Sequence, residues 1–165
     1  MSRSAIAIRG VERCDLGAIV RIDEKLSGQT REAYWRQRLD MAALRPPWMS
    51  LVAETDNRVV GFLFGWVGES EFGVAGPTGW VDLIGVDPPY RGQGVGRALV
   101  DRFAESGREL RAVRKVATLI DLGQADVREF FVRLGLHHGP MIQMERDLPA
   151  RSPGAKRATA PRGDR

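Results

Sequence analysis

The sequence predicts a mixed α/β fold in one domain, and three stretches predict it. Residues 48–54 and 58–67 are apolar runs rich in β-branched and aromatic residues, and the polar residues 55–57 between them predict an antiparallel hairpin. Residues 80–86 form an apolar run too short for a helix, and a glycine-rich turn joins it to a helical pattern that begins at Val95. Strands and helices therefore follow one another along the chain, as in the α/β class.

Three elements are expected before the hairpin. Residues 5–9 (AIAIR) predict a short first strand. Asp15 can cap the helix that follows, because a carboxylate accepts hydrogen bonds from the first backbone amides of a helix. Thr30 can cap a second helix over residues 31–44, and Pro46 ends it because proline has no backbone N–H to donate.

The remaining elements are expected after the glycine-rich turn. Helical spacing of apolar residues predicts helices over residues 95–110 and 124–134, with a strand over 115–121 between them. Residues 137–140 and 141–147 supply strand material for the end of the domain. The complete predicted order is β-α-α-β-β-β-α-β-α-β-β.

Length and charge indicate one folded unit with a basic tail. At 165 residues the chain can bury a sizeable core, and we expect the domain to cover residues 1–148. Residues 149–165 hold five Lys or Arg and one Asp, a surplus of four that equals the formal net charge of +4. The domain is therefore formally neutral, which argues against a nucleic-acid groove on it. The tail is rich in Pro, Gly, Ala and Arg and is expected to be disordered.

Cysteine content and hydropathy favour the cytoplasm. Cys14 is the only cysteine, so the chain cannot form an internal disulfide. No apolar run approaches membrane-spanning length, and the N-terminus lacks the long apolar core of a signal peptide. We expect a cytoplasmic protein without membrane contact. We also expect no metal site, because no residues show metal-ligand spacing.

The turn that leads into the helix at Val95 has the composition of an anion-binding loop. Gly92, Gly94 and Gly96 alternate with other residues, and Arg91 and Arg97 add positive charge beside them. A glycine backbone can approach a ligand closely, and the following helix offers unpaired amides and the positive end of its dipole. The expected ligand is therefore a phosphate group.

Three interpretations of this turn compete with that of a coenzyme-binding loop. A Walker loop would end in Gly-Lys-Ser or Gly-Lys-Thr, whereas this turn ends in Gly96-Arg97-Ala98, so a Walker loop is excluded. A dinucleotide fingerprint would need glycine at position 97, but Asp121 could serve as its ribose-binding acid, so this alternative stays open. A turn that binds nothing is disfavoured, because glycine destabilises a fold unless the backbone geometry requires it.

The spacing Arg91-x-x-Gly94-x-Gly96 resembles the acetyl-CoA signature of the GNAT superfamily of N-acetyltransferases. The surrounding sequence VDPPYRGQGVG is similar to that family's strand-to-helix junction. The resemblance covers roughly residues 5–148 and is strongest over 50–136. It implies a mixed, mostly antiparallel central sheet flanked by helices. It also implies an enzyme that transfers the acetyl group of acetyl-CoA to a primary amine by direct attack in a ternary complex.

The resemblance also implies where the coenzyme binds. In the family the turn amides hold its pyrophosphate, the preceding strand edge pairs with its pantetheine arm, and an amide side chain and a tyrosine lie in or before the last helix. The implied coenzyme contacts are Ile84, Gly85, Val86, Arg91, Gly92, Gln93, Gly94, Val95, Gly96, Arg97, Gln124 and Phe131.

Asp82 is the leading candidate for the catalytic base. In a regular strand it shares a face with apolar residues such as Ile84, and an acid there is costly unless it is paired or used. Family members often carry an acid at this position that contacts the amine. Glu24, in the polar link between the first two helices, is the second candidate. Glu69 and Glu71 are weaker ones that could attract a cationic amine.

The expected general acid is missing. Phe131 occupies the position of the family's tyrosine, and phenylalanine has no proton to give. Tyr34 and Tyr90 are the only tyrosines, and neither matches that position. Transfer can still proceed, since a thiol with a pKa of about 8.5 leaves tolerably as thiolate near neutral pH. The alternative function is a non-catalytic acyl-CoA-binding sensor.

The sequence leaves the acceptor open among a protein N-terminus, a lysine and a small-molecule amine. The partners that we expect are acetyl-CoA and this amine. The oligomeric state, including a homodimer, also stays open.

Overall fold

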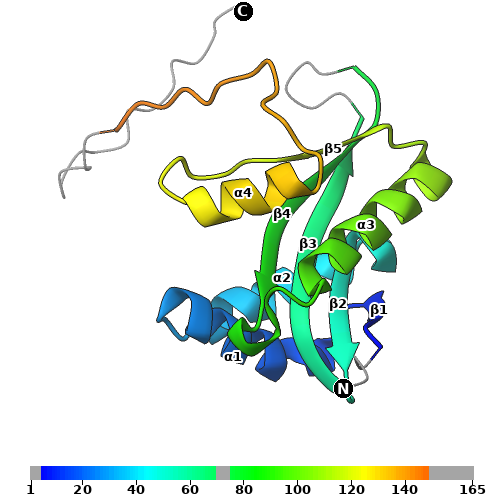
Figure 1. Ribbon diagram of the computed structural model, residues 1–165, viewed down its shortest axis with the longest axis vertical. Helices are drawn as coiled ribbons and strands as arrows, with labels where there is room; N and C mark the ends of the chain where they lie inside the picture. Colours follow the sequence, from blue (N-terminus) through cyan, green and yellow to red (C-terminus); the bar gives the residue numbers. More distant parts are fainter. Residues whose placement is uncertain (1–4, 70–74, 149–165) are drawn as a thin grey trace, which may run out of the picture.

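A computed structural model describes residues 5–69 and 75–148 of the chain. Its main elements are β1 (Ala7–Gly10), α1 (Leu16–Ser27), α2 (Glu32–Ala42), β2 (Ser50–Thr55), β3 (Arg58–Gly68), β4 (Thr78–Val86), α3 (Val95–Arg111), β5 (Lys115–Thr118) and α4 (Ala125–Arg133). The strands form one sheet in the order β1-β2-β3-β4-β5, antiparallel up to β4 and parallel between β4 and β5. Helices α1 and α2 cover one face, and α3 and α4 the other (Figure 1). The predicted mixed, mostly antiparallel sheet is confirmed.

The hairpin of β2 and β3 has the turn that its sequence predicts. Asp56 and Asn57 have φ angles of 49° and 58°, in the left-handed region that Asp and Asn adopt more readily than most residues. Two such residues form a turn whose twist matches that of paired strands. The strands consequently pair from Ser50 opposite Phe64 to Thr55 opposite Arg58, with one irregularity after Ala53.

Each face of the sheet carries its own hydrophobic cluster. Leu99 and Phe103 of α3 lie one helical turn apart and are buried together with Phe131 of α4. On the opposite face, Trp35 and Leu39 of α2 are buried against β2 and β3. These two clusters fix the helices on the sheet, so the loops between strands and helices have defined positions.

The second helix begins later than its sequence predicts. Arg31 occupies the N-terminal cap and α2 starts at Glu32, so the prediction that Thr30 caps this helix is wrong. The Thr30 hydroxyl instead donates a hydrogen bond of 2.6 Å to a carboxylate oxygen of Glu24. In a cap the Thr30 oxygen would accept from a backbone amide of the helix, whereas here its hydroxyl is oriented to donate to a carboxylate.

The prediction of two closing strands is also wrong. Residues 137–140 and 141–147 contain no strand, and the side chains of 137–148 are all exposed. Ile142 and Met144 alternate with polar residues as in a half-buried strand, but none of the five strands of the sheet pairs with this segment, so its apolar side chains have no face to cover. The segment instead runs away from the sheet after α4 (Figure 1). The predicted tail, residues 149–165, lies outside the described residues.

Candidate active site

The glycine-rich turn has the backbone conformation that its glycines allow. After a 3₁₀ turn at Pro88–Tyr90, Gly92 and Gly94 have φ angles of 72° and 91°. These lie in the left-handed region, which a side chain disfavours. Gly94 occupies the N-terminal cap of α3, and Val95 is the first helical residue. Gln93 stabilises the turn through a hydrogen bond of 2.9 Å from its side-chain amide to the Pro89 carbonyl.

Six consecutive backbone amides of this turn lack an acceptor. The amides of Tyr90 and Arg91 donate to carbonyls just before them, and the first helical hydrogen bond of α3 runs from the Ala98 amide to the Gly94 carbonyl. Within the described residues, the amides of residues 92–97 donate no hydrogen bond. Unpaired amides at a helix N-terminus form an anion-binding site, because the helix dipole adds positive potential there.

Two of the predicted coenzyme residues are glycines because of packing. A Cβ atom on Gly96 would lie 2.9 Å from the ring of Phe130, so the contact between α3 and α4 requires glycine there. A Cβ atom on Gly85 would lie 2.5 Å from the ring of Phe62. Both glycines therefore have a structural role that would exist without any ligand.

The predicted site residues differ in which of their atoms a ligand could reach. Val95 is 2% exposed and Phe131 is 3% exposed, and both side chains pack in the α3 cluster. Ile84 packs against the same cluster. Val95 and Ile84 consequently offer a ligand mainly their backbone, and the Phe131 ring is committed to the core. Gln124 is exposed immediately before α4.

The two arginines of the turn have different surroundings. Arg97 donates a hydrogen bond of 2.9 Å to the carbonyl of Arg133, the last residue of α4. Its charge thus lies at the negative end of the α4 dipole. Arg91 is exposed, and its side chain makes no hydrogen bond or ion pair within the described part of the chain. Arg91 is therefore the arginine that is available to an anion.

The strand before the turn has an unpaired edge. Strands β4 and β5 pair only from Thr78 opposite Lys115 to Val81 opposite Thr118. Residues 83–86 of β4 pair with β3, and residues 82–86 have no β5 partner among the described residues. Their backbone groups on that side can pair with an extended ligand, as in peptide recognition by an added strand. This edge contains Ile84, Gly85 and Val86.

The sequence position of Asp82 predicts that it shares a face of the sheet with Ile84, and this prediction is wrong. Phe64 pairs with Leu83 and Gly65 pairs with Val81, so Asp82 is the extra residue of a β-bulge. A bulge shifts the alternation of side chains by one position. The Asp82 carboxylate consequently lies on the α2 side of the sheet and forms an ion pair with Arg38 of α2. Its side chain is 41% exposed, so solvent or an acceptor can reach it.

Glu24 lies within the last turn of α1, so the prediction that it belongs to the link between the first two helices is wrong. It accepts the hydrogen bond from Thr30 described above. No hydrogen bond or ion pair joins it to Asp82 within the described residues. The neighbouring Lys25 binds both carboxylate oxygens of Asp87 at 2.8 and 2.9 Å, which connects α1 to the glycine-rich turn. Glu69 follows the end of β3, and Glu71 falls outside the described residues.

A buried acid that is not among the predicted site residues joins the first two helices. Asp23 is 4% exposed and accepts hydrogen bonds of 2.9 and 2.6 Å from Arg31 and of 2.7 Å from the indole N–H of Trp35. Burial by itself would raise the pKa of Asp23, but the hydrogen bonds from Arg31 and Trp35 lower it below the ordinary value. Its position on the apolar stripe of α1, four residues after Ile19, could have indicated a buried role.

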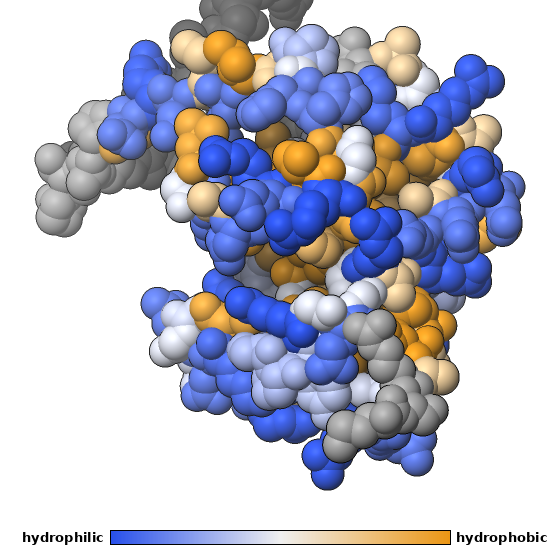
Figure 2. Space-filling model, in the orientation of Figure 1, coloured by the Kyte–Doolittle hydropathy of each residue, from blue (hydrophilic) through white to orange (hydrophobic). Residues whose placement is uncertain are grey.

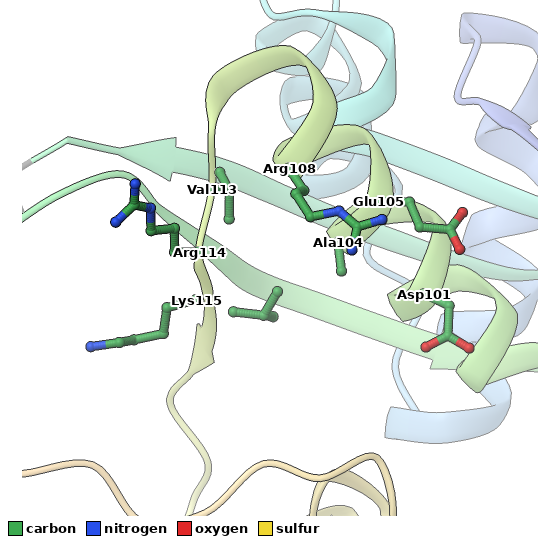
Figure 3. A pocket seen from close by; sticks show the side chains of 8 residues that line it. Asp101, Ala104, Glu105, Arg108, Val113, Arg114 and Lys115 are labelled. Carbon is green, nitrogen blue, oxygen red and sulfur yellow. The ribbon is translucent and has the colours of Figure 1, made fainter.

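A cavity of about 260 Å³ lies away from these residues, between α3 and β5. Its lining includes acidic Asp101 and Glu105 from α3 and basic Lys115 from β5, and it contains none of the predicted site residues (Figure 3).

Figure 2 shows mostly hydrophilic residues on the visible face, with hydrophobic ones gathered in a hollow near its middle. Among the described residues, no helix has the length and apolar composition needed to cross a bilayer, and no three metal-binding side chains cluster.

Comparisons with known proteins agree with this geometry. The model of the acetyltransferase (GNAT) family matches residues 18–136. The aminoglycoside N-acetyltransferase AAC(6′)-Iy, solved in complex with CoA, superposes with a TM-score of 0.75 at 17% identity, over 88% of this chain and 97% of that one. A ribosomal-protein-alanine N-acetyltransferase from Brucella melitensis biovar Abortus 2308 has a TM-score of 0.68 at 20% identity, over 88% of this chain and 100% of the other. Ard1 from Thermoplasma volcanium has a TM-score of 0.66 at 24% identity, over 79% of this chain and 82% of the other.

These structures share the fold of the chain, and the family match extends from α1 to the residues just after α4. The matched region contains the glycine-rich turn, the unpaired edge of β4 and the bulge at Asp82. The chain therefore belongs to the acetyltransferase (GNAT) family.

Proposed function

We propose that this protein transfers the acetyl group of acetyl-CoA to a primary amine by direct attack within a ternary complex. The observation that carries the proposal is the run of six unpaired amides, residues 92–97, at the N-terminus of α3 beside the unpaired edge of β4. This arrangement suits a ligand with a diphosphate and an extended arm that bears amide groups. Membership of the family supports the same donor.

The residues present fit this coenzyme. The amides of residues 92–97 and the side chain of Arg91 would hold its diphosphate, and the backbone of residues 84–86 would pair with its arm. The exposed Gln124 amide is a further contact. When bound, the coenzyme supplies a thioester-activated acetyl group. The buried Phe131 ring would support the site through the core.

On the acceptor side, Asp82 is the group that we assign to the amine. An ammonium group must lose a proton before it can attack, and a carboxylate within hydrogen-bond distance can hold that proton. Asp82 is exposed enough for such contact, although Arg38 engages one of its oxygens. Glu24, in the last turn of α1 before the α1–α2 link, is the second group that could receive the proton.

Calorimetry with acetyl-CoA tests the coenzyme site. Replacing Gly92 and Gly94 together by valine should weaken binding at least tenfold, because β-branched residues disfavour positive φ and the turn must rearrange. Gly76→Val is the matched control, since Gly76 has a φ of 88° at the opposite end of β4. Equal affinity of both variants, with circular dichroism showing intact folds, would contradict the assignment.

A second candidate function is acyl-CoA binding without catalysis. Two observations favour it: the residue at the expected acid position is the buried Phe131, and Asp82 is already paired with Arg38. This function predicts tight coenzyme binding with no release of free thiol for any amine. Thiol release measured with a panel of peptides, polyamines and aminoglycosides separates the two functions.

A further inference from the structure

A small polar pocket lies on the α2 side of the sheet, next to the bulge at Asp82. Its volume is about 10 Å³, close to the space of one water molecule. It is lined by Arg38, Met41, Ala42, Arg45, Ser50, Phe64 and Gly65. Phe64 and Gly65 are the β3 residues on either side of the bulge, and Arg38 also pairs with Asp82. The pocket and the proposed amine site therefore share a wall.

Ser50 gives this pocket an unused hydrogen-bonding group. The residue is 4% exposed, and its side chain makes no hydrogen bond within the described residues. The hydroxyl can therefore donate a hydrogen bond to a ligand oxygen that enters the pocket.

Two arginines supply positive charge at the same place. The Arg38 guanidinium lies over the Phe64 ring, 5.9 Å from its centroid, and it donates to one oxygen of Asp82. The Arg45 guanidinium makes only a long contact of 3.4 Å with the Gly65 carbonyl. With Asp82 counted against them, the two arginines leave a formal charge of +1 and several N–H groups for an anion.

We propose that this pocket binds a carboxylate of the acceptor, through Arg38, Arg45 and Ser50, while the amine of the same molecule lies at Asp82. The inference rests on the proposed function and names its acceptor class: amines with a carboxylate a few bonds away. A single carboxylate oxygen fits a space of about one water molecule, whereas a whole phosphate group does not. Two kinds of acceptor have this chemistry: small amino acids, and peptides whose first residue is Asp or Glu.

Matched acceptors test the inference. The peptide amides Asp-Ala-Ala and Asn-Ala-Ala differ only in the carboxylate, as do β-alanine and its amide among small molecules. For the wild-type protein, we expect kcat/KM from thiol release to be at least tenfold higher for the carboxylate member of one pair. Which pair responds tells whether the acceptor is a peptide or a small molecule. Equal rates within both pairs would overturn the inference.

Variants then locate the preference. In the double variant Arg45→Gln with Ser50→Ala, the ratio within the responding pair should fall to about one. Arg36→Gln is the control, because Arg36 lies on α2 but pairs with Glu32 outside the pocket, and it should keep the wild-type ratio. A preference that survives in the double variant would place the carboxylate elsewhere.

Binding measurements keep this inference separate from the proposed function. Calorimetry of the same four compounds without coenzyme does not depend on turnover. Tighter binding of a carboxylate compound without any thiol release would support the pocket and contradict catalysis. Acetyl transfer to neutral and carboxylate amines at equal rates would support catalysis and contradict the pocket. Equal binding within both pairs in the wild type would also overturn the pocket.

Discussion

Replacing Asp23 by asparagine should destabilise the protein in a pH-dependent way. The change removes the charge but almost keeps the shape of a side chain that is 4% exposed and accepts three hydrogen bonds from Arg31 and Trp35. Breaking a buried ion pair costs about 3–5 kcal/mol. The Arg31 side chain is 40% exposed, so water can solvate its freed guanidinium. We therefore expect a loss at the lower end of that range, about 3 kcal/mol, in the free energy of unfolding at pH 7.

The dependence on pH follows from the lowered pKa of Asp23. Folding depresses this pKa, so the carboxylate contributes stability above its unfolded pKa of about 3.9, and this stability is lost as the pH falls through the folded value. Urea unfolding at pH 7 and at pH 3 measures this contribution to the free energy of unfolding. The difference in the free energy of unfolding between wild type and Asp23→Asn should be largest at pH 7 and smaller at pH 3. A difference below 1 kcal/mol at pH 7, or one that does not narrow in acid, would refute this reasoning.

Three further predictions concern the proposed site. Asp82→Asn should lower turnover about 10²–10⁴-fold, the usual contribution of a general base, while calorimetry finds unchanged acetyl-CoA affinity. Glu24→Gln should lower turnover less than Asp82→Asn if Asp82 is the base, and the reverse order in the same assay would exchange their roles. Gly96→Ala should cost about 1–3 kcal/mol in urea unfolding, because its Cβ would lie 2.9 Å from Phe130; an unchanged midpoint would contradict that contact.

The glycine-rich turn could be predicted from the sequence because its determinants are local. Positive φ at Gly92 and Gly94 and the start of α3 at Val95 depend on residues within the turn itself. The same holds for the hairpin at Asp56 and Asn57. In each case the residue type restricts the backbone directly, so few alternatives remain.

The position of Asp82 could not be predicted, because a bulge depends on the neighbouring strand. The bulge is opposite Phe64 and Gly65 of β3, and a Cβ atom on Gly65 would lie 2.7 Å from the Phe103 ring of α3. The shift in register between β3 and β4 therefore lies where β3 packs closely against α3, and the β4 sequence alone contains no sign of that contact. The partnership of Asp23 with Arg31 and Trp35 was missed for a related reason, since two helices must first pack before that acid is buried.

The bulge and the separation of the strands coincide along β4. The last pair between β4 and β5 is Val81 with Thr118, and the bulged residue Asp82 follows at once. A bulge bends its strand and increases the local twist, which accounts for the departure of β4 from β5 at this point. Where β5 has left, groups on both faces of the sheet can approach the edge of β4. The turn amides lie at the start of α3, on one face of the sheet. Asp82 lies on the opposite face, which α2 covers. This edge is therefore where an acyl donor and an amine held from opposite faces could meet, which supports direct transfer between them.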